Sequence, residues 1–254
     1  MELTIIVIIS LIAVSFIAGL VDSIAGGGGL LMVPSLLLAG LQPQYALGTN
    51  KFLSTSGTSI AVANFLRKKK MAFKIIASGI IFALIGGFFG AKVALSFSQE
   101  MLGKIIIFLL PVAAIVVLYP RKNIKAKEHL LSKDLYFKVP LICIVIGFYD
   151  GFFGPGTGSF LAISFYVILG LGLIEATANA KMINLATNLG ALVSFMIAGK
   201  VIYLLGIPLA ISNMFGNYLG SHLAITKGEK VIKLFLIIVL VILMITLVWR
   251  FFIK

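Results

Sequence analysis

The feature that constrains this chain most is a motif that occurs twice: a lone aspartate followed by clustered glycines, set between two apolar runs. The first copy is GLVDSIAGGGG (residues 19–29) and the second is GFYDGFFGPGTG (residues 147–158). An isolated carboxylate at membrane depth is costly and marks a functional site by default. Glycine lets the backbone turn sharply, and unwound backbone is tolerated in a membrane only where protein or a water-filled cavity surrounds it. We therefore interpret the two motifs as paired halves of one site.

The composition places this site in a membrane protein. Of 254 residues, 61% are hydrophobic and only 11% are charged, and the mean hydropathy is +1.16. These values predict an all-α polytopic membrane protein whose single transport domain spans residues 1–254. The formal charge of +13 comes from short basic stretches between apolar runs, which is typical of positive-inside loops rather than nucleic-acid binding. We expect a multi-pass membrane protein, with the lipid bilayer as its partner.

The sequence favours a carrier over an enzyme. It contains no P-loop motif, no His/Glu metal cluster and no Ser–His pair, so we expect no enzymatic activity, no cofactor and no metal site. The single cysteine, Cys143, lies in an apolar run and excludes an intramolecular disulfide. Energy for transport must then come from a gradient or a partner.

The apolar runs follow the same plan in both halves. Two short runs flank each motif, and three longer segments follow it. A G-x-x-x-G spacing, which lets helix backbones touch, occurs at 86–90 and again at 216–220. In the first half the runs are 3–21, 30–41, 45–66, 72–95 and 102–119, and in the second they are 138–153, 157–171, 175–198, 202–223 and 231–250.

The register between the halves indicates an internal duplication. Asp22 and Asp150 are separated by 150 − 22 = 128 positions, and Lys51 and Lys181 by 181 − 51 = 130. A single two-residue shift followed by constant spacing is what a duplication predicts. We therefore expect repeat 1 at 1–120, a cytoplasmic linker at 121–137 and repeat 2 at 138–254.

Each repeat is expected to contain a glycine-broken helical hairpin plus three transmembrane helices. If the basic loops 67–74 and 120–138 lie inside, segments 41–45 and 96–101 lie outside. A hairpin that returns to its own side then makes the two repeats inverted, which is a recurring transporter plan. The alternative is that each hairpin crosses once, which would make the repeats parallel. We adopt the inverted plan as the prediction.

The charged residues of the two repeats are the leading candidates for chemistry. Asp22 and Asp150 would act as proton-titrating or gate-locking carboxylates, and the structural alternative is that each is a helix N-cap. Lys51 and Lys181 would contact an anion or pair with the aspartate of the same half. Their alternative role is snorkelling to the membrane interface.

Backbone and amide groups near these charges complete the predicted site. Glycine-rich breaks expose N–H groups at helix N-termini, which bind anions readily, and nearby Asn and Thr side chains could line a polar path or bond helices together. Cations and donors dominate, so a small anion is the expected substrate, with protons as a candidate coupling ion. The candidate substrate- or ion-binding residues are Asp22, Gly26, Gly27, Gly28, Asn50, Lys51, Asp150, Gly154, Gly156, Thr157, Asn179, Lys181, Asn184 and Asn188.

These motifs resemble the sulfite exporter TauE/SafE family, also called the toluene sulfonate uptake permease family. The matching segments are DSIAGGGG (22–29), ALGTNK (46–51), GFYDGFFGPGTG (147–158), ATANAK (176–181) and NLG (188–190). The resemblance covers almost the whole chain except loop 120–138, and it implies a multi-pass protein of a bacterial-type inner or plasma membrane.

The resemblance implies a secondary permease or exporter of small anions such as sulfite, organosulfonates or related organic acids, built from two homologous halves. From the residues we expect alternating access around the paired motifs. Two other classes are kept as alternatives: a structural or accessory membrane protein, and a membrane enzyme.

Overall fold

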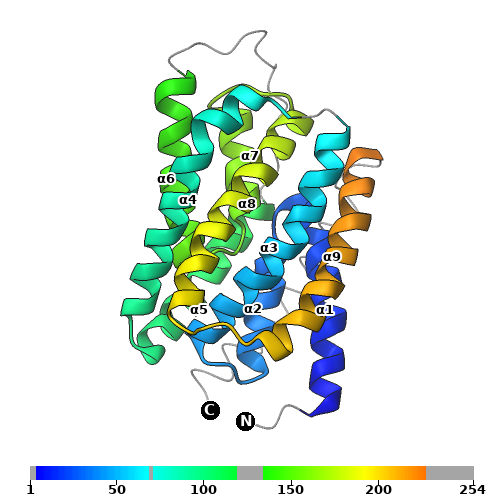
Figure 1. Cartoon of the computed structure of the whole chain (residues 1–254), viewed down its shortest axis with the longest axis vertical. Helices are drawn as coiled ribbons and strands as arrows, with labels where there is room; N and C mark the ends of the chain where they lie inside the picture. The colour runs from blue at the N-terminus through cyan, green and yellow to red at the C-terminus, as the bar shows by residue number, and fades with distance from the viewer. Residues whose placement is uncertain (1–3, 69–70, 119–133, 227–254) are drawn as a thin grey trace.

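The computed structural model describes residues 4–68, 71–118 and 134–226, and this part of the chain forms a bundle of helices without strands (Figure 1). The first-half helices are α1 (Ile5–Ala25), α2 (Gly28–Leu38), α3 (Pro43–Arg67), α4 (Phe73–Ser96) and α5 (Gln99–Leu118). The second-half helices are η1 (Asp134–Lys138), α6 (Val139–Phe152), α7 (Thr157–Val167), α8 (Leu173–Ile197) and α9 (Tyr203–Thr226). The predicted run 231–250 lies outside the described residues.

Helix length separates the spanning segments from the broken ones. Five described segments are long and apolar enough to cross a membrane: α1, α4, α5, α8, and η1 together with α6. By contrast, α2 and α7 have only 11 residues each, which at about 1.5 Å per residue reach roughly halfway across a hydrocarbon core. The predicted all-α class with several membrane-spanning helices is therefore confirmed, and a short helix follows a glycine-containing break in each half.

Glycines in the left-handed region end the first helix of each hairpin. Gly26 has φ of 71° where α1 stops, and Gly154 and Gly156 have φ of 94° and 87° between α6 and α7. Residues with a Cβ adopt such angles at a steric cost. In the second break, the hydroxyl of Tyr149 donates to the carbonyl of Pro155 at 2.7 Å, which holds the turn in place.

One helix of each half packs against helices of the other half. Helix α4 of the first half lies against α6 and α8 of the second, and α9 of the second half lies against α1 and α3 of the first. In the predicted repeat, α4 corresponds to α9 and α1 to α6, and each of these contacts then has its counterpart across the molecule. In Figure 1, α1 starts at the lower end of the bundle while its counterpart α6 starts at the upper end.

The predicted G-x-x-x-G spacings are confirmed as sites of close helix contact. A Cβ at Gly86 or Gly90 would strike the carbonyl oxygen of Ile144 or Phe148 on α6, and one at Gly216 would strike that of Phe16 on α1. Small residues at such positions let backbones approach, which is the main source of helix association in lipid. The two interfaces between the halves therefore depend on glycine.

Two boundaries differ from the sequence prediction. Helical structure begins at Asp134, inside the predicted linker, with a π-helical turn that runs into α6; the Lys138 ammonium pairs with the Asp134 carboxylate at 2.6 Å. Helix α1 continues past the apolar run 3–21 to Ala25 and so includes Asp22. A helix can continue through a charged residue when that charge finds a partner, and hydrophobic patterning alone does not reveal the partner.

Replacing Gly90 by Ser should destabilise the fold, because the added atoms meet the carbonyl of Phe148. We expect the free energy of unfolding to fall by about 1–3 kcal/mol, as for an overpacked interface, read as a lowered melting temperature in detergent. The matched control is Gly172→Ser, where a Cβ meets nothing within 4 Å and serine is a favoured N-cap. Equal melting temperatures for the two variants would contradict this account of the interface.

Candidate functional site

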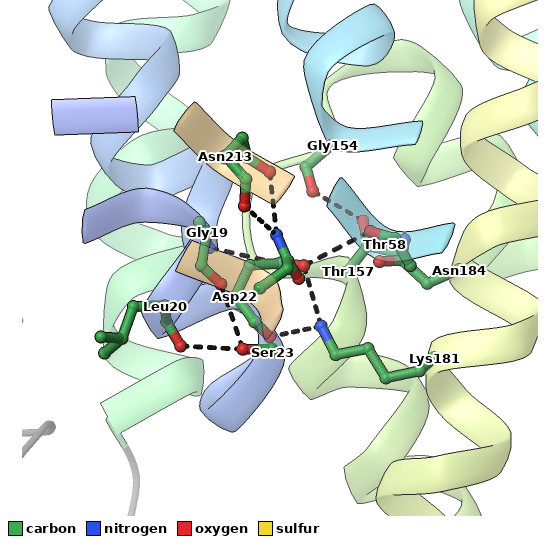
Figure 2. A network of polar contacts seen from close by, with 12 residues as sticks. Gly19, Leu20, Asp22, Ser23, Thr58, Gly154, Thr157, Lys181, Asn184 and Asn213 are labelled. Carbon is green, nitrogen blue, oxygen red and sulfur yellow. Dashed lines mark hydrogen bonds and ion pairs between the residues drawn. The ribbon is translucent and has the colours of Figure 1, made fainter. Parts of the chain in front are cut away.

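The centre of the bundle contains two ion pairs that cross between the halves. Lys51 Nζ on α3 lies 2.8 Å from Asp150 Oδ1 on α6. Lys181 Nζ on α8 lies 2.9 Å from Asp22 Oδ2 on α1 (Figure 2). The prediction that each lysine pairs with the aspartate of its own half is wrong, because the halves pack by exchanging helices and each lysine faces the broken hairpin of the other half.

Both lysines are fully interior, so the snorkelling alternative is also wrong. Lys51 and Lys181 are each 1% exposed, as is Asp150, and only the Asp22 side chain retains 17% exposure. Desolvating a charge costs several kcal/mol unless a partner with good geometry compensates it. Each ion therefore depends on a residue contributed by the other half of the protein.

The aspartates lie in the last turns of α1 and α6, and the N-cap alternative is wrong for both. A negative charge near a helix C-terminus is unfavourable, because carbonyl dipoles point toward it. The lysines offset this cost, and Lys181 also donates to the backbone carbonyl of Asp22. Asp22 retains a weak capping role, since its Oδ1 accepts from the N–H of Gly28 at the start of α2 over 3.4 Å.

The two helix breaks touch each other at this point. A Cβ at Gly26 would collide with the backbone of Gly158 and Ser159, and one at Gly29 would lie 3.1 Å from Pro155 Cα. On the Lys51 side, a Cβ at Gly154 would lie 2.9 Å from the lysine Nζ. The glycines thus let the two breaks meet and let an ammonium group approach the backbone.

A small polar cavity lies between the breaks and the two lysine-bearing helices. Its free volume is about 10 Å³, which is at the lower limit for one water molecule. This volume holds no more than about one water molecule, so a larger solute enters only after the helices move. The lining residues are Asp22, Gly26, Gly29, Asn50, Lys51, Ser54, Asp150, Gly154, Gly156, Thr157, Gly158, Asn184 and Asn188.

Most of the predicted site residues line this cavity, and four do not. Lys181 is joined to it through Asp22, while Gly27 and Gly28 form the start of α2. Asn179 has a structural contact, because its Oδ1 accepts from the N–H of Ala72 at 3.0 Å, just before α4. Thr49, its counterpart in the first half, accepts from the N–H of Ile202 at 3.1 Å, just before α9.

Three lining residues were absent from the predicted set: Ser54, Gly29 and Gly158. Helical spacing could have identified Ser54, which lies four residues after Asn50 and three after Lys51 and so shares their face of α3. The two glycines belong to the motifs, but the sequence alone does not say which glycines of a cluster face inward.

The site combines charges of both signs. Its lining contains the carboxylates of Asp22 and Asp150, the ammonium group of Lys51, amide and hydroxyl side chains, and the N-terminus of α7, where the helix dipole favours negative charge. The ammonium group of Lys181 lies outside the lining and pairs with Asp22. Within the described ranges, no group of three or more His, Cys, Asp or Glu residues is placed to hold a metal ion.

Comparison with known proteins agrees with this reading of the chain. The family model described as sulfite exporter TauE/SafE matches residues 11–247. A probable membrane transporter protein YfcA from Escherichia coli K12 is 37% identical over 230 residues, covering 89% of this chain and 84% of the relative. A probable membrane transporter protein ORF9 from a Sinorhizobium species is 35% identical, covering 90% of this chain and 87% of the relative.

A probable membrane transporter protein from Haemophilus influenzae is 34% identical and covers 88% of this chain and 87% of its own length. No solved structure matches the chain. With a broken helical hairpin in each half and a family match over nearly its full length, the chain is a multi-pass membrane transporter that belongs to the TauE/SafE sulfite exporter family.

Proposed function

We propose that the protein is a secondary transporter of small anions, such as sulfite, organosulfonates or related organic acids, that works by alternating access. The observation that supports this best is the pair of buried Lys–Asp contacts, each made between the two halves, around a cavity where both helix breaks meet. Packing alone does not require charged pairs here, because apolar side chains of similar volume stabilise a buried site as well or better. The charges therefore favour a carrier over a purely structural protein.

Alternating access needs at least two conformations, and the small volume of the cavity supports a conformational change during transport. With about 10 Å³ of free space, the site has no room for a sulfonate, so transport requires the halves to separate on one side at a time. The short helices α2 and α7 begin at the cavity, so a movement of either helix would change the shape of the site. Each ion pair would then serve as a gate whose partners part when its side opens.

The inverted plan for the repeats is part of the proposal. Equivalent helices begin at opposite ends of the bundle in Figure 1, and Gln42 and Gly172, which are 130 positions apart, are the N-caps of α3 and α8 with nearly the same backbone angles. In inverted repeats these two positions face opposite sides of the membrane, and in parallel repeats they face the same side.

Cysteine accessibility tests this topology. In a Cys143→Ser background, a cysteine at Gln42 should react with a membrane-impermeant maleimide from outside intact cells. A cysteine at Gly172 should react only after the membrane is opened. Labelling of both from the same side would contradict inverted repeats and support parallel ones.

Reconstitution tests the transport function itself. Proteoliposomes containing the purified protein should take up labelled sulfite or a small sulfonate faster than protein-free vesicles, and neutral amino acids should not be taken up. An accessory protein would give no flux, and a membrane enzyme would alter its substrate instead of moving it. Absence of flux for every small anion offered would overturn the proposal.

Proton coupling follows from charge balance in the buried site. Two lysines and two aspartates make it neutral as drawn, so a bound monovalent anion leaves one uncompensated negative charge, which is costly at this depth. Uptake of one proton by an aspartate restores neutrality. A lower pH on the side of the membrane where the anion binds should therefore accelerate its transport to the other side.

Replacing Asp150 or Asp22 by Asn, which cannot titrate, tests this coupling. Transport driven by a pH gradient should be lost in each variant, while anion exchange between equal pools continues where the protein still opens. Both assays are to be run on the same reconstituted sample. Wild-type rates of pH-driven transport in both variants would refute proton coupling.

A further inference from the structure

The two halves of the central site are not chemically equivalent. Positions that correspond by the 130-residue repeat hold different side chains: Asn50 against Ala180, and Asn188 against Thr58. Asn50 and Asn188 both line the cavity beside Lys51, whereas Thr58 donates to Asp22 Oδ2 over a long 3.5 Å. At these two pairs of positions, the amide side chain is the one beside Lys51.

The two lysines are also engaged differently. Lys181 donates to both the carboxylate and the backbone carbonyl of Asp22, which ties it to the end of α1 (Figure 2). Lys51 lines the cavity and donates to Asp150 Oδ1 and to Asn188 Oδ1 at 3.0 Å. An ammonium group has three protons, so two side-chain contacts leave Lys51 one further proton to offer a ligand.

Two acceptors beside Lys51 have no hydrogen-bond partner among the described residues: Asp150 Oδ2 and Asn50 Oδ1. Their residues are only 1% and 3% exposed, and both line the cavity. A buried acceptor without a partner costs free energy and calls for an explanation, such as a ligand that supplies the missing donor.

We infer that the Lys51–Asp150 half is where the anion binds, and that it prefers an anion carrying its own hydrogen-bond donor. The anionic group accepts from Lys51 at the N-terminus of α7, and the ligand's O–H donates to Asp150 Oδ2. The Lys181–Asp22 half ties the two repeats together and acts as a gate. This inference rests on the proposed transport function and names the substrate-bearing half of that site.

A matched pair of ligands tests the preference for a donor. The hydroxyl of 2-hydroxyethanesulfonate can reach an acceptor, and ethanesulfonate lacks that hydroxyl. We expect the purified protein to bind the hydroxylated compound about tenfold more tightly, the value of one hydrogen bond to a charged group. Binding is measured by the ligand-dependent shift in melting temperature and by competition with labelled sulfite. Equal affinities would overturn the preference.

Substitutions at equivalent positions test which half binds. Asn188→Thr gives the second half the residue of the first and removes a Lys51 partner, so anion affinity should fall about tenfold. The control is Thr58→Ser, a small reduction at the equivalent position that leaves the hydroxyl in place, and its affinity should stay within about twofold of wild type. Equal affinity for the two variants would overturn the assignment to Lys51.

Charge-neutral double variants give the same answer without leaving an unpaired buried ion. The double variant Lys51→Gln, Asp150→Asn should show no ligand-dependent shift in melting temperature with 2-hydroxyethanesulfonate, ethanesulfonate or sulfite. Lys181→Gln with Asp22→Asn should lower the melting temperature and slow transport while anion binding persists. The reverse pattern would place the anion at Lys181. A wild-type protein that neither binds nor moves any of the three anions would instead overturn the proposed function together with the inference.

Discussion

The structure depends on charges that compensate each other in the interior of the bundle, where their side chains are largely removed from solvent. Each of the two buried lysines has its carboxylate partner on the opposite half of the chain. Separating such a pair in a dry environment leaves two ions that cost several kcal/mol each. The halves are thus held together at their centre by contacts that neither half can make alone, and any movement that separates them must provide a replacement partner for each ion.

The glycines make this arrangement geometrically possible. The contact of Gly26 with Gly158 brings the two helix breaks together, and the absence of a side chain at Gly154 gives the Lys51 ammonium its place beside the backbone. Along the outer contacts, Gly90 and Gly216 let α4 and α9 approach the helices of the other half. Packing and electrostatics are coupled here, because the ion pairs form only when the backbones are this close.

Much of the fold could be predicted from the sequence, because hydrophobic runs and a constant repeat spacing are local or periodic signals. The helix types, the broken hairpins and the contact role of residues 86–90 and 216–220 all follow from them. The partner of each lysine could not be predicted. Same-half and cross-half pairing have the same sequence pattern, and only the exchange of α4 and α9 between the halves decides between them.

The roles of the asparagine residues on α8 could not be predicted from the sequence either. Asn179 and Asn184 lie on one helix among similar neighbours, yet Asn179 holds the backbone of Ala72 and Asn184 lines the cavity. Their spacing of five residues puts them on different faces of α8, but the sequence does not say which face is directed at the site. That information belongs to the packing of α8 against α3 and α4.

The duplication that the repeat spacing indicates would explain how two similar halves can hold a site with unequal side chains. Thr49 and Asn179 make equivalent contacts despite their different side chains. Each accepts a hydrogen bond from a backbone N–H group just before a helix of the other half: Asn179 from Ala72 before α4, and Thr49 from Ile202 before α9. Near the cavity the equivalent positions have diverged, as Asn188 and Thr58 show. In the transporter proposed here, a single anion bound beside Lys51 would contact only one member of each such pair closely, and the second copy would then be able to serve as a gate.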